Sequence, residues 1–185
     1  MRTLCPSSRT PKSLKRLKLE RIDLWQLHRI DRKVPVEESL GAIKKARDAG
    51  KIRHVGLSEV TVAEIEQSKK VVPIVSIQNQ YNITDRDSEA ALDYCQKEKM
   101  GFIPWAPIGG NRNPLLHTTG NALEAEAKRH NVSVVQLALA WLLQKSPVML
   151  PIPGTSSLQH LEENMAAAKL QLTPDDWKRI ELTKS

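Results

Sequence analysis

Short apolar segments alternate with amphipathic stretches along the chain, and this alternation constrains the fold more than any other feature of the sequence. The apolar segments have the length and composition of buried strands, and the stretches between them carry apolar residues at helical spacing. Strands that alternate with helices are typical of a parallel sheet built from βα units. We therefore expect an α/β fold with five parallel strands that begin near residues 22, 52, 74, 101 and 148, each followed by at least one helix.

Capping residues mark several of the expected helix ends. Gly50 closes an amphipathic stretch and suits the left-handed conformation that commonly ends a helix. Thr173 followed by Pro174 combines a capping residue with proline at the first helical position. Two further pairs have the spacing of a capping box, in which each partner satisfies a backbone N–H of the other. These pairs are Thr61 with Glu64 and Ser133 with Gln136.

Two architectures fit alternating strands and helices: an open doubly wound sheet and part of a closed barrel. The 185 residues are fewer than the roughly 250 of a complete (β/α)8 barrel. Neither G-x-G-x-x-G nor the P-loop motif occurs, so the common phosphate-binding signatures of open sheets are missing.

The distribution of charge argues against nucleic-acid binding. The formal net charge is +7, but seven of the 28 basic residues lie within the first 21 positions with a single acidic residue. The rest of the chain is nearly neutral, whereas a nucleic-acid-binding domain concentrates basic residues on one face. We therefore expect no nucleic-acid partner.

Cysteine content and hydropathy narrow the cellular setting. Cys5 and Cys95 form neither a disulfide framework nor a metal-ligand motif, so we expect free thiols and no bound metal. No run of 18 or more apolar residues occurs, so we expect no membrane partner. The N-terminal segment weakly resembles a transit peptide but continues into a helical-looking stretch, and we expect a cytoplasmic protein.

Polar or aromatic residues follow each expected strand. In a βα barrel the reacting groups lie at the carboxyl ends of the strands, where the following loops converge. Together they offer a histidine, amides, hydroxyls and an indole, which suit an aromatic ligand with amide hydrogen-bonding groups. Each strand end taken alone is also explained by the polar residues that ordinary turns contain. In chain order these residues are His28-Arg29, Ser58-Glu59, Gln78-Asn79-Gln80, Trp105-Ala106-Pro107 and Gly154-Thr155-Ser156-Ser157.

The last of these groups has the features of an anion site. Gly154-Thr155-Ser156-Ser157 lies between an expected strand and an expected helix, so hydroxyls and free backbone N–H groups gather where the helix dipole favours negative charge. Phosphate would fit this position. A helix cap without a ligand explains the same residues equally well.

Five sequence blocks together resemble the aldo-keto reductase superfamily in content, order and separation. The resemblance covers about residues 12–182 and is strongest to bacterial-type members that carry PIPGTSS before the final large helix. It implies a (β/α)8 (TIM) barrel that binds NADP(H) and transfers hydride to aldehydes or ketones. The blocks are IDLWQLHR (22–29), GKIRHVGLSEV (50–60), IQNQYN (77–82), GFIPWAPI (101–108) and PIPGTSSLQHLEENMAA (151–167).

The resemblance also implies roles for individual residues. His28 matches the histidine of the family's Asp-Tyr-Lys-His tetrad, which orients and polarises the substrate carbonyl. Glu59 replaces the commoner Asn, and Gly154 and His160 replace Lys and Arg in many members, which weakens the electrostatic preference for NADP over NAD. The cofactor-binding positions implied are Ser58 and Gln78 for the carboxamide, Trp105 for the nicotinamide ring with Ala106 and Pro107 beside it, Gly154, Thr155, Ser156 and His160 for the 2′-phosphate, and Glu163 and Asn164 for the adenine.

The matched part corresponds to strands four to eight of the family barrel. Residues 1–11 form a basic segment that does not match, and residues 12–185 form a partial barrel domain without strands one to three and without the tetrad Asp, Tyr and Lys. A general acid contributes about 10²–10⁴ in rate, so we expect feeble activity from these residues alone. Unpaired strand edges favour self-association, and we expect a homodimer through the exposed edges.

Two functions remain open from the sequence. The first is an NADP(H)-dependent oxidoreductase that reduces a small carbonyl substrate to an alcohol, and whether the chain is itself an active enzyme depends on the missing tetrad residues. The second is a non-catalytic nucleotide-binding or interaction module derived from the same fold. In the family that the chain resembles, variable loops set the substrate, and the loop over residues 109–120 is one of them.

Overall fold

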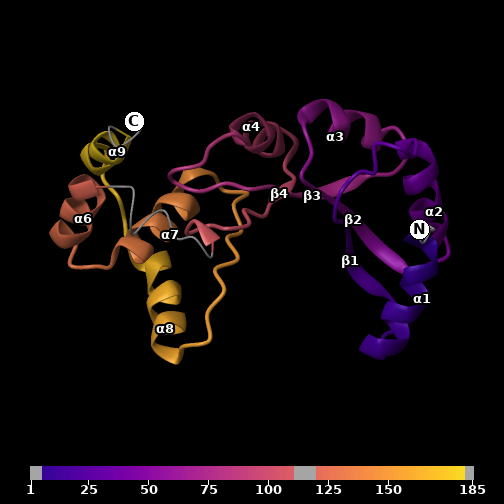
Figure 1. Cartoon of the computed structure of the whole chain (residues 1–185), viewed down its shortest axis with the longest axis horizontal. Helices are drawn as coiled ribbons and strands as arrows, with labels where there is room; N and C mark the ends of the chain where they lie inside the picture. The colour runs from indigo at the N-terminus through magenta and orange to yellow at the C-terminus, as the bar shows by residue number, and fades with distance from the viewer. Residues whose placement is uncertain (1–5, 111–119, 182–185) are drawn as a thin grey trace. The chain divides into compact units, whose positions relative to one another are not determined.

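The computed structural model describes residues 6–110 and 120–181 and divides into two compact units, Met1–Gln78 and Asn79–Ser185 (Figure 1). The first five residues of the basic N-terminal segment and most of the loop expected over 109–120 lie outside the described residues. We describe each unit by itself.

The first unit alternates helices with strands, as the sequence predicts. Gly50 has a φ of +71° and follows the second helix, so the predicted left-handed helix end is confirmed. Thr61 and Glu64 form the predicted capping box at the start of the third helix. The elements are α1 (Pro6–Leu17), β1 (Ile22–Leu27), α2 (Val36–Asp48), β2 (Ile52–Ser58), α3 (Val62–Lys69) and β3 (Ile74–Gln78).

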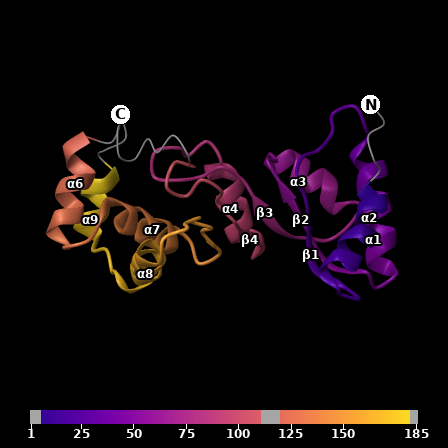
Figure 2. The ribbon, with the colours of Figure 1, turned by 60° about the horizontal axis from the view of Figure 1, so that its bottom comes forward.

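The strands of the first unit form a parallel sheet in sequence order. β1 pairs with β2, with Leu27 opposite Leu57, and β2 pairs with β3, with Ser58 opposite Gln78. Helix α2 packs against β2 and α3, and α1 packs on α2 (Figure 2). The side chains of Leu57 and Ile77 are fully buried, and β2 is buried without alternation from Val55 to Ser58.

One glycine in β2 permits a close approach of two side chains. A Cβ at Gly56 would lie 2.4 Å from Ser76 Oγ and 2.9 Å from Gln26 Cγ. The missing side chain lets Gln26 Nε2 donate to Ser76 Oγ over a distance of 3.4 Å across β2. Only glycine fits at this position without a shift of its neighbours.

The second unit is mainly helical. Ser133 and Gln136 form the second predicted capping box, and the predicted helix start at Thr173-Pro174 is also confirmed. No described helix is both long and apolar enough to cross a membrane. The elements are α4 (Glu89–Glu98), β4 (Gly101–Phe102), α6 (Gly120–Arg129), α7 (Val134–Lys145), α8 (Leu158–Ala166), the 3-10 helix η2 (Ala167–Lys169) and α9 (Pro174–Glu181).

An aromatic cluster forms the core of the second unit. The Tyr81 ring stacks on Trp141 at a centroid distance of 6.0 Å and meets Phe102 edge-on at 5.9 Å. Burial and a hydrogen bond to the Glu89 carboxylate raise the pKa of Tyr81 above its ordinary value, so this hydroxyl stays protonated. Since Tyr81 is fully buried, it is part of the core and is not accessible to a substrate.

The expectation of a fifth strand over residues 148–153 is wrong for the described structure. Phe102 N donates to Val148 O and Leu150 N donates to Phe102 O, both at 2.8 Å, and these bonds form an isolated parallel bridge between Phe102 and Met149. The next donor of this parallel ladder would be the N–H of residue 104, and Pro104 has none. The ladder therefore stops, and β4 ends at Phe102.

Candidate functional site

Three residues proposed from the sequence lie at the carboxyl edge of the sheet in the first unit. Ser58 and Gln78 end neighbouring strands and are direct partners in the parallel register. His28 follows Leu27, which is opposite Leu57, and its side chain is exposed. The sheet therefore places a hydroxyl, an amide and an imidazole at the ends of three adjacent strands.

The hydroxyl of Ser58 has a fixed orientation. Ser58 Oγ donates to the Gln78 carbonyl oxygen over 2.8 Å, and Glu59 N donates to the same oxygen over 3.1 Å. Because its proton is used in this way, the Ser58 hydroxyl offers lone pairs that accept hydrogen bonds. Among the described residues the side-chain amide of Gln78 has no hydrogen-bond partner, so both of its polar groups are available to a ligand.

Glu59 has a backbone conformation that is uncommon for a residue with a side chain. Its φ is +55°, and its carboxylate lies 3.7 Å from the guanidinium of Arg29. The positive φ turns the chain sharply at the end of β2, a kind of strain that occurs often at binding sites.

In the second unit, backbone hydrogen bonds hold the Trp105-Ala106-Pro107 segment. Trp105 N donates to Asn79 O over 3.1 Å, and Trp105 forms a parallel bridge with Gln80. Ala106 has a φ of +50°, which L residues adopt only under constraint. The Trp105 ring is half-buried, so part of it is accessible.

Asn82 holds this segment in place, and sequence reasoning missed it. Its Nδ2 donates to Ala106 O over 3.0 Å, while its Oδ1 accepts hydrogen bonds from Thr84 N, Thr84 Oγ1 and Asp85 N at 2.8–2.9 Å. The side chain is buried and uses both polar atoms. The block IQNQYN contains Asn82, but no sequence pattern shows that this residue reaches 24 positions ahead to Ala106.

The GTSS segment forms the N-terminal end of α8. Ser157 caps the helix through its Oγ, which accepts from His160 N over 3.4 Å, and Thr155 Oγ1 accepts from Ser157 N over 3.1 Å. The side chains of Thr155 and Ser156 are exposed, and the first turn of α8 contains no acidic residue. These features are compatible with a bound anion.

The residues that the resemblance assigns to the adenine lie further along α8. Glu163 accepts through its backbone oxygen from Gln136 Nε2 over 3.2 Å, and its carboxylate accepts from Gln159 Nε2 over 2.9 Å. Asn164 is half-buried and His160 is exposed. Helix α8 thus carries His160, Glu163 and Asn164, while the structure describes Trp105 and its neighbours on a separate segment of the same unit.

A cluster of titratable residues that the sequence did not suggest joins α6 to α9. His130 Nε2 lies 3.4 Å from Glu126 Oε1 and 3.2 Å from Asp176 Oδ2. Arg179 Nε donates to Glu126 Oε2 over 2.7 Å, and Arg179 also donates to Asp176. Glu126, His130 and Asp176 each offer one atom that could bind a metal ion. Arg179 already binds both carboxylates, so the cluster acts as an ion-pair network.

The pKa of Asp176 shows how strongly this network favours its charged form. Burial raises the pKa, but hydrogen bonds from the backbone and side chain of Thr173 and the charges around it outweigh burial and lower the pKa to about 2. Thr173 N donates to Asp176 Oδ2 over 2.7 Å, so the same carboxylate completes the cap of α9.

Comparisons with known proteins place this geometry in a family. The sequence matches the model of the Aldo/keto reductase family over residues 8–183. It is 46% identical to an uncharacterized oxidoreductase of Schizosaccharomyces pombe, over 91% of this chain and 54% of that protein. It is 41% identical to pyridoxine 4-dehydrogenase of Escherichia coli, over 76% of this chain and 48% of that protein. The chain thus spans about half the length of these curated relatives.

Solved structures match the fold as well. A thermostable aldo-keto reductase in complex with the inhibitor epalrestat has a TM-score of 0.87 and 32% identity, over 94% of this chain and 64% of that one. An aldo/keto reductase from Klebsiella pneumoniae in complex with NADP and acetate has a TM-score of 0.82 and 25% identity, over 94% of this chain and 62% of that one. The parallel strands, their order and both comparisons agree that the chain belongs to the aldo-keto reductase family.

Proposed function

We propose that this chain carries the cofactor-binding part of an NADP(H)-dependent oxidoreductase that reduces aldehydes or ketones to alcohols. The observation that carries the proposal is the alignment of His28, Ser58 and Gln78 at the carboxyl ends of three neighbouring parallel strands. Ligands of barrel enzymes bind at this edge. The family match and the NADP-bound structure from Klebsiella pneumoniae support the choice of cofactor.

The N-terminal end of α8 fits the phosphate of NADP(H). Thr155 and Ser156 expose hydroxyls there, and a Cβ at Gly154 would meet nothing within 4 Å, so the approach to the backbone is open. The segment has no Lys or Arg between 154 and 160, and the phosphate would be held by hydroxyls and the helix dipole. We therefore propose NADP(H), with NAD(H) bound less tightly.

The resemblance assigns Ser58 and Gln78 to the nicotinamide carboxamide and Trp105 to the nicotinamide ring. The Ser58 hydroxyl accepts and the Gln78 amide both donates and accepts, which matches the N–H and C=O groups of a carboxamide. Trp105 offers an accessible indole face for ring stacking. Bound NADPH supplies the hydride that reduces the carbonyl carbon.

His28 is the residue that we propose to act on the substrate. Its imidazole has no hydrogen-bond partner among the described residues, so an N–H is available to bind the carbonyl oxygen. A hydrogen bond at that atom stabilises the negative charge that develops during reduction. The family's tetrad Asp, Tyr and Lys have no counterpart that we recognise in these residues, so we propose that water supplies the proton and that turnover is slow.

The experiment combines binding and turnover in the 185-residue chain. NADPH titrated by calorimetry should bind, and oxidation of NADPH with a reactive aldehyde should be slow but measurable. His28→Gln should abolish turnover and preserve binding, whereas His54→Gln, an exposed histidine within β2, should change neither. Binding without turnover in the unmodified chain would favour the nucleotide-binding module, and failure to bind would refute both functions.

The substrate and the assembly are further parts of this proposal. Pyridoxine, named for the Escherichia coli relative, is a suitable first substrate for the reverse reaction with NADP⁺. β1 pairs only with β2 among the described strands, and Leu24 on β1 is 41% exposed. We propose self-association through this edge in the cytoplasm, and sedimentation of the unmodified chain and of Leu24→Lys would test it.

A further inference from the structure

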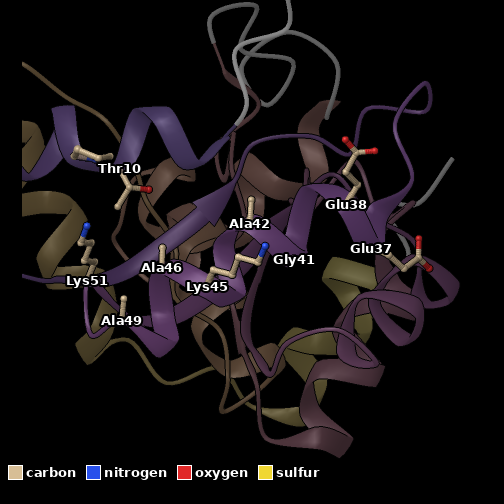
Figure 3. Close-up of a pocket in the computed structure, with 10 residues that line it drawn as sticks. Thr10, Glu37, Glu38, Gly41, Ala42, Lys45, Ala46, Ala49 and Lys51 are labelled. Atoms are coloured by element: carbon tan, nitrogen blue, oxygen red, sulfur yellow. The ribbon is translucent and has the colours of Figure 1, made fainter.

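A cavity between α1 and α2 lies in the first unit (Figure 3). Its volume is about 640 Å³, within the range of small-molecule sites. One face of α2 supplies the floor, where Gly41, Ala42 and Ala46 are too small to fill the space between the helices. A Cβ at Gly41 would meet nothing within 4 Å, so the space above it is open.

A buried polar group faces this space without a partner. Thr10 on α1 lines the cavity, is only 1% exposed, and its Oγ1 makes no hydrogen bond. A buried hydroxyl without a partner carries a desolvation cost that a bound ligand would remove. Of residues 10–17 of α1, whose exposure the structure describes, only Thr10 is buried.

Charged residues of opposite sign lie at the two ends of the cavity. Figure 3 shows Lys51 near Thr10 at one end, Glu38 at the other, and Lys45 between them. None of these three side chains has an ion-pair partner among the described residues. The arrangement follows from the helix itself, since Glu38 lies in the first turn of α2 and Lys51 follows its end.

We propose that this cavity binds an elongated zwitterionic small molecule. Its anionic group binds Thr10 Oγ1 and the ammonium groups of Lys51 and Lys45, and its cationic group lies at Glu38. Its aliphatic body covers the small residues of α2. Seven residues of helix separate Glu38 from Lys45, which is about 10 Å, so an aliphatic chain of several carbons spans the two charges.

The test uses ε-aminocaproate as the probe, with caproate and hexylamine as matched molecules that carry only one of the charges. Backbone amide shifts of Gly41, Ala42 and Ala46 in the ¹⁵N-labelled full chain report occupancy of the cavity. Saturable shifts at millimolar ε-aminocaproate, with weaker binding of both matched molecules, are the expected result. Equal affinity for caproate, or no saturable shift, would overturn the proposal.

Four variants separate binding from folding. Thr10→Val keeps the side-chain shape and should weaken binding about fivefold. Lys45→Met should weaken it about threefold, whereas its neighbour Lys44→Met should not, because Lys44 pairs with Asp48 and does not line the cavity. Gly41→Leu should fill the cavity, abolish binding and leave the chain at least as stable, since leucine is the better helix former. Unchanged binding in Gly41→Leu would contradict the assigned position.

Discussion

Asn82 provides the sharpest test of how the second unit positions the proposed nicotinamide-stacking segment. Its side chain donates one hydrogen bond to Ala106 O and accepts three, two of them from the backbone N–H groups of Thr84 and Asp85. Asn82→Ala leaves three backbone groups without these partners. At about 1 kcal/mol for each hydrogen bond, the free energy of unfolding should fall by about 2–4 kcal/mol.

Asn82→Asp isolates the bond to Ala106. The aspartate keeps the acceptor for Thr84 and Asp85 but brings a carboxylate oxygen against the Ala106 carbonyl, where only a donor fits. We expect a loss of about 1–3 kcal/mol in urea unfolding, together with at least tenfold weaker NADPH binding because Trp105 loses its fixed position.

Two control variants separate positioning from general destabilisation. Thr84→Val removes one hydrogen bond to Asn82 at an exposed residue, and the free energy of unfolding should fall by about 0.5 kcal/mol. Ser133→Ala removes the cap of α7 and should cost about 1 kcal/mol with unchanged NADPH affinity. If Asn82→Asp bound NADPH as tightly as the unmodified chain, the positioning role would be refuted.

Three further predictions concern other residues. Gly56→Ala should destabilise the first unit by about 1–3 kcal/mol in urea unfolding, because the new methyl would overlap Ser76 Oγ, and an unchanged midpoint would show that the neighbours adapt freely. The pKa of Asp176 is lowered from 3.8 to about 2 in the folded state, so ionised Asp176 stabilises the fold fully above its ordinary pKa, and this stabilisation is lost as the pH falls toward 2. Asp176→Asn should be less stable at neutral pH, and its free energy of unfolding should lack this decrease at acid pH. Burial raises the pKa of Cys95 to about 12, so in a Cys5→Ser background a thiol reagent at mildly alkaline pH should react only after unfolding, and rapid labelling of the folded chain would contradict this.

Local signals in the sequence predicted much of the fold. Apolar runs located β1 and β2, and the two capping boxes located the starts of α3 and α7, because these features depend on residues only a few positions apart. The prediction failed at Val148–Pro153, where the apolar composition is that of a strand but the facing Pro104 lacks the N–H that would extend the ladder.

The candidate site was predicted less completely. The residues at the strand ends follow from chain order, so His28, Ser58 and Gln78 could be placed before the structure was known. The role of Asn82, the contacts among Glu126, His130, Asp176 and Arg179, and the cavity beside Thr10 could not be predicted. Each depends on residues distant in sequence that packing brings together, and no local pattern encodes such contacts.

The central claim is that the chain binds NADP(H) with the 2′-phosphate at the N-terminal end of α8. Amide shifts of Ser156, Ser157 and His160, measured while NADP⁺ and then NAD⁺ is added to the ¹⁵N-labelled chain, test it most directly. We expect saturable shifts at these three amides that are stronger with NADP⁺ and that Ser156→Ala weakens. Shifts absent from this segment, or equal for the two nucleotides, would contradict it.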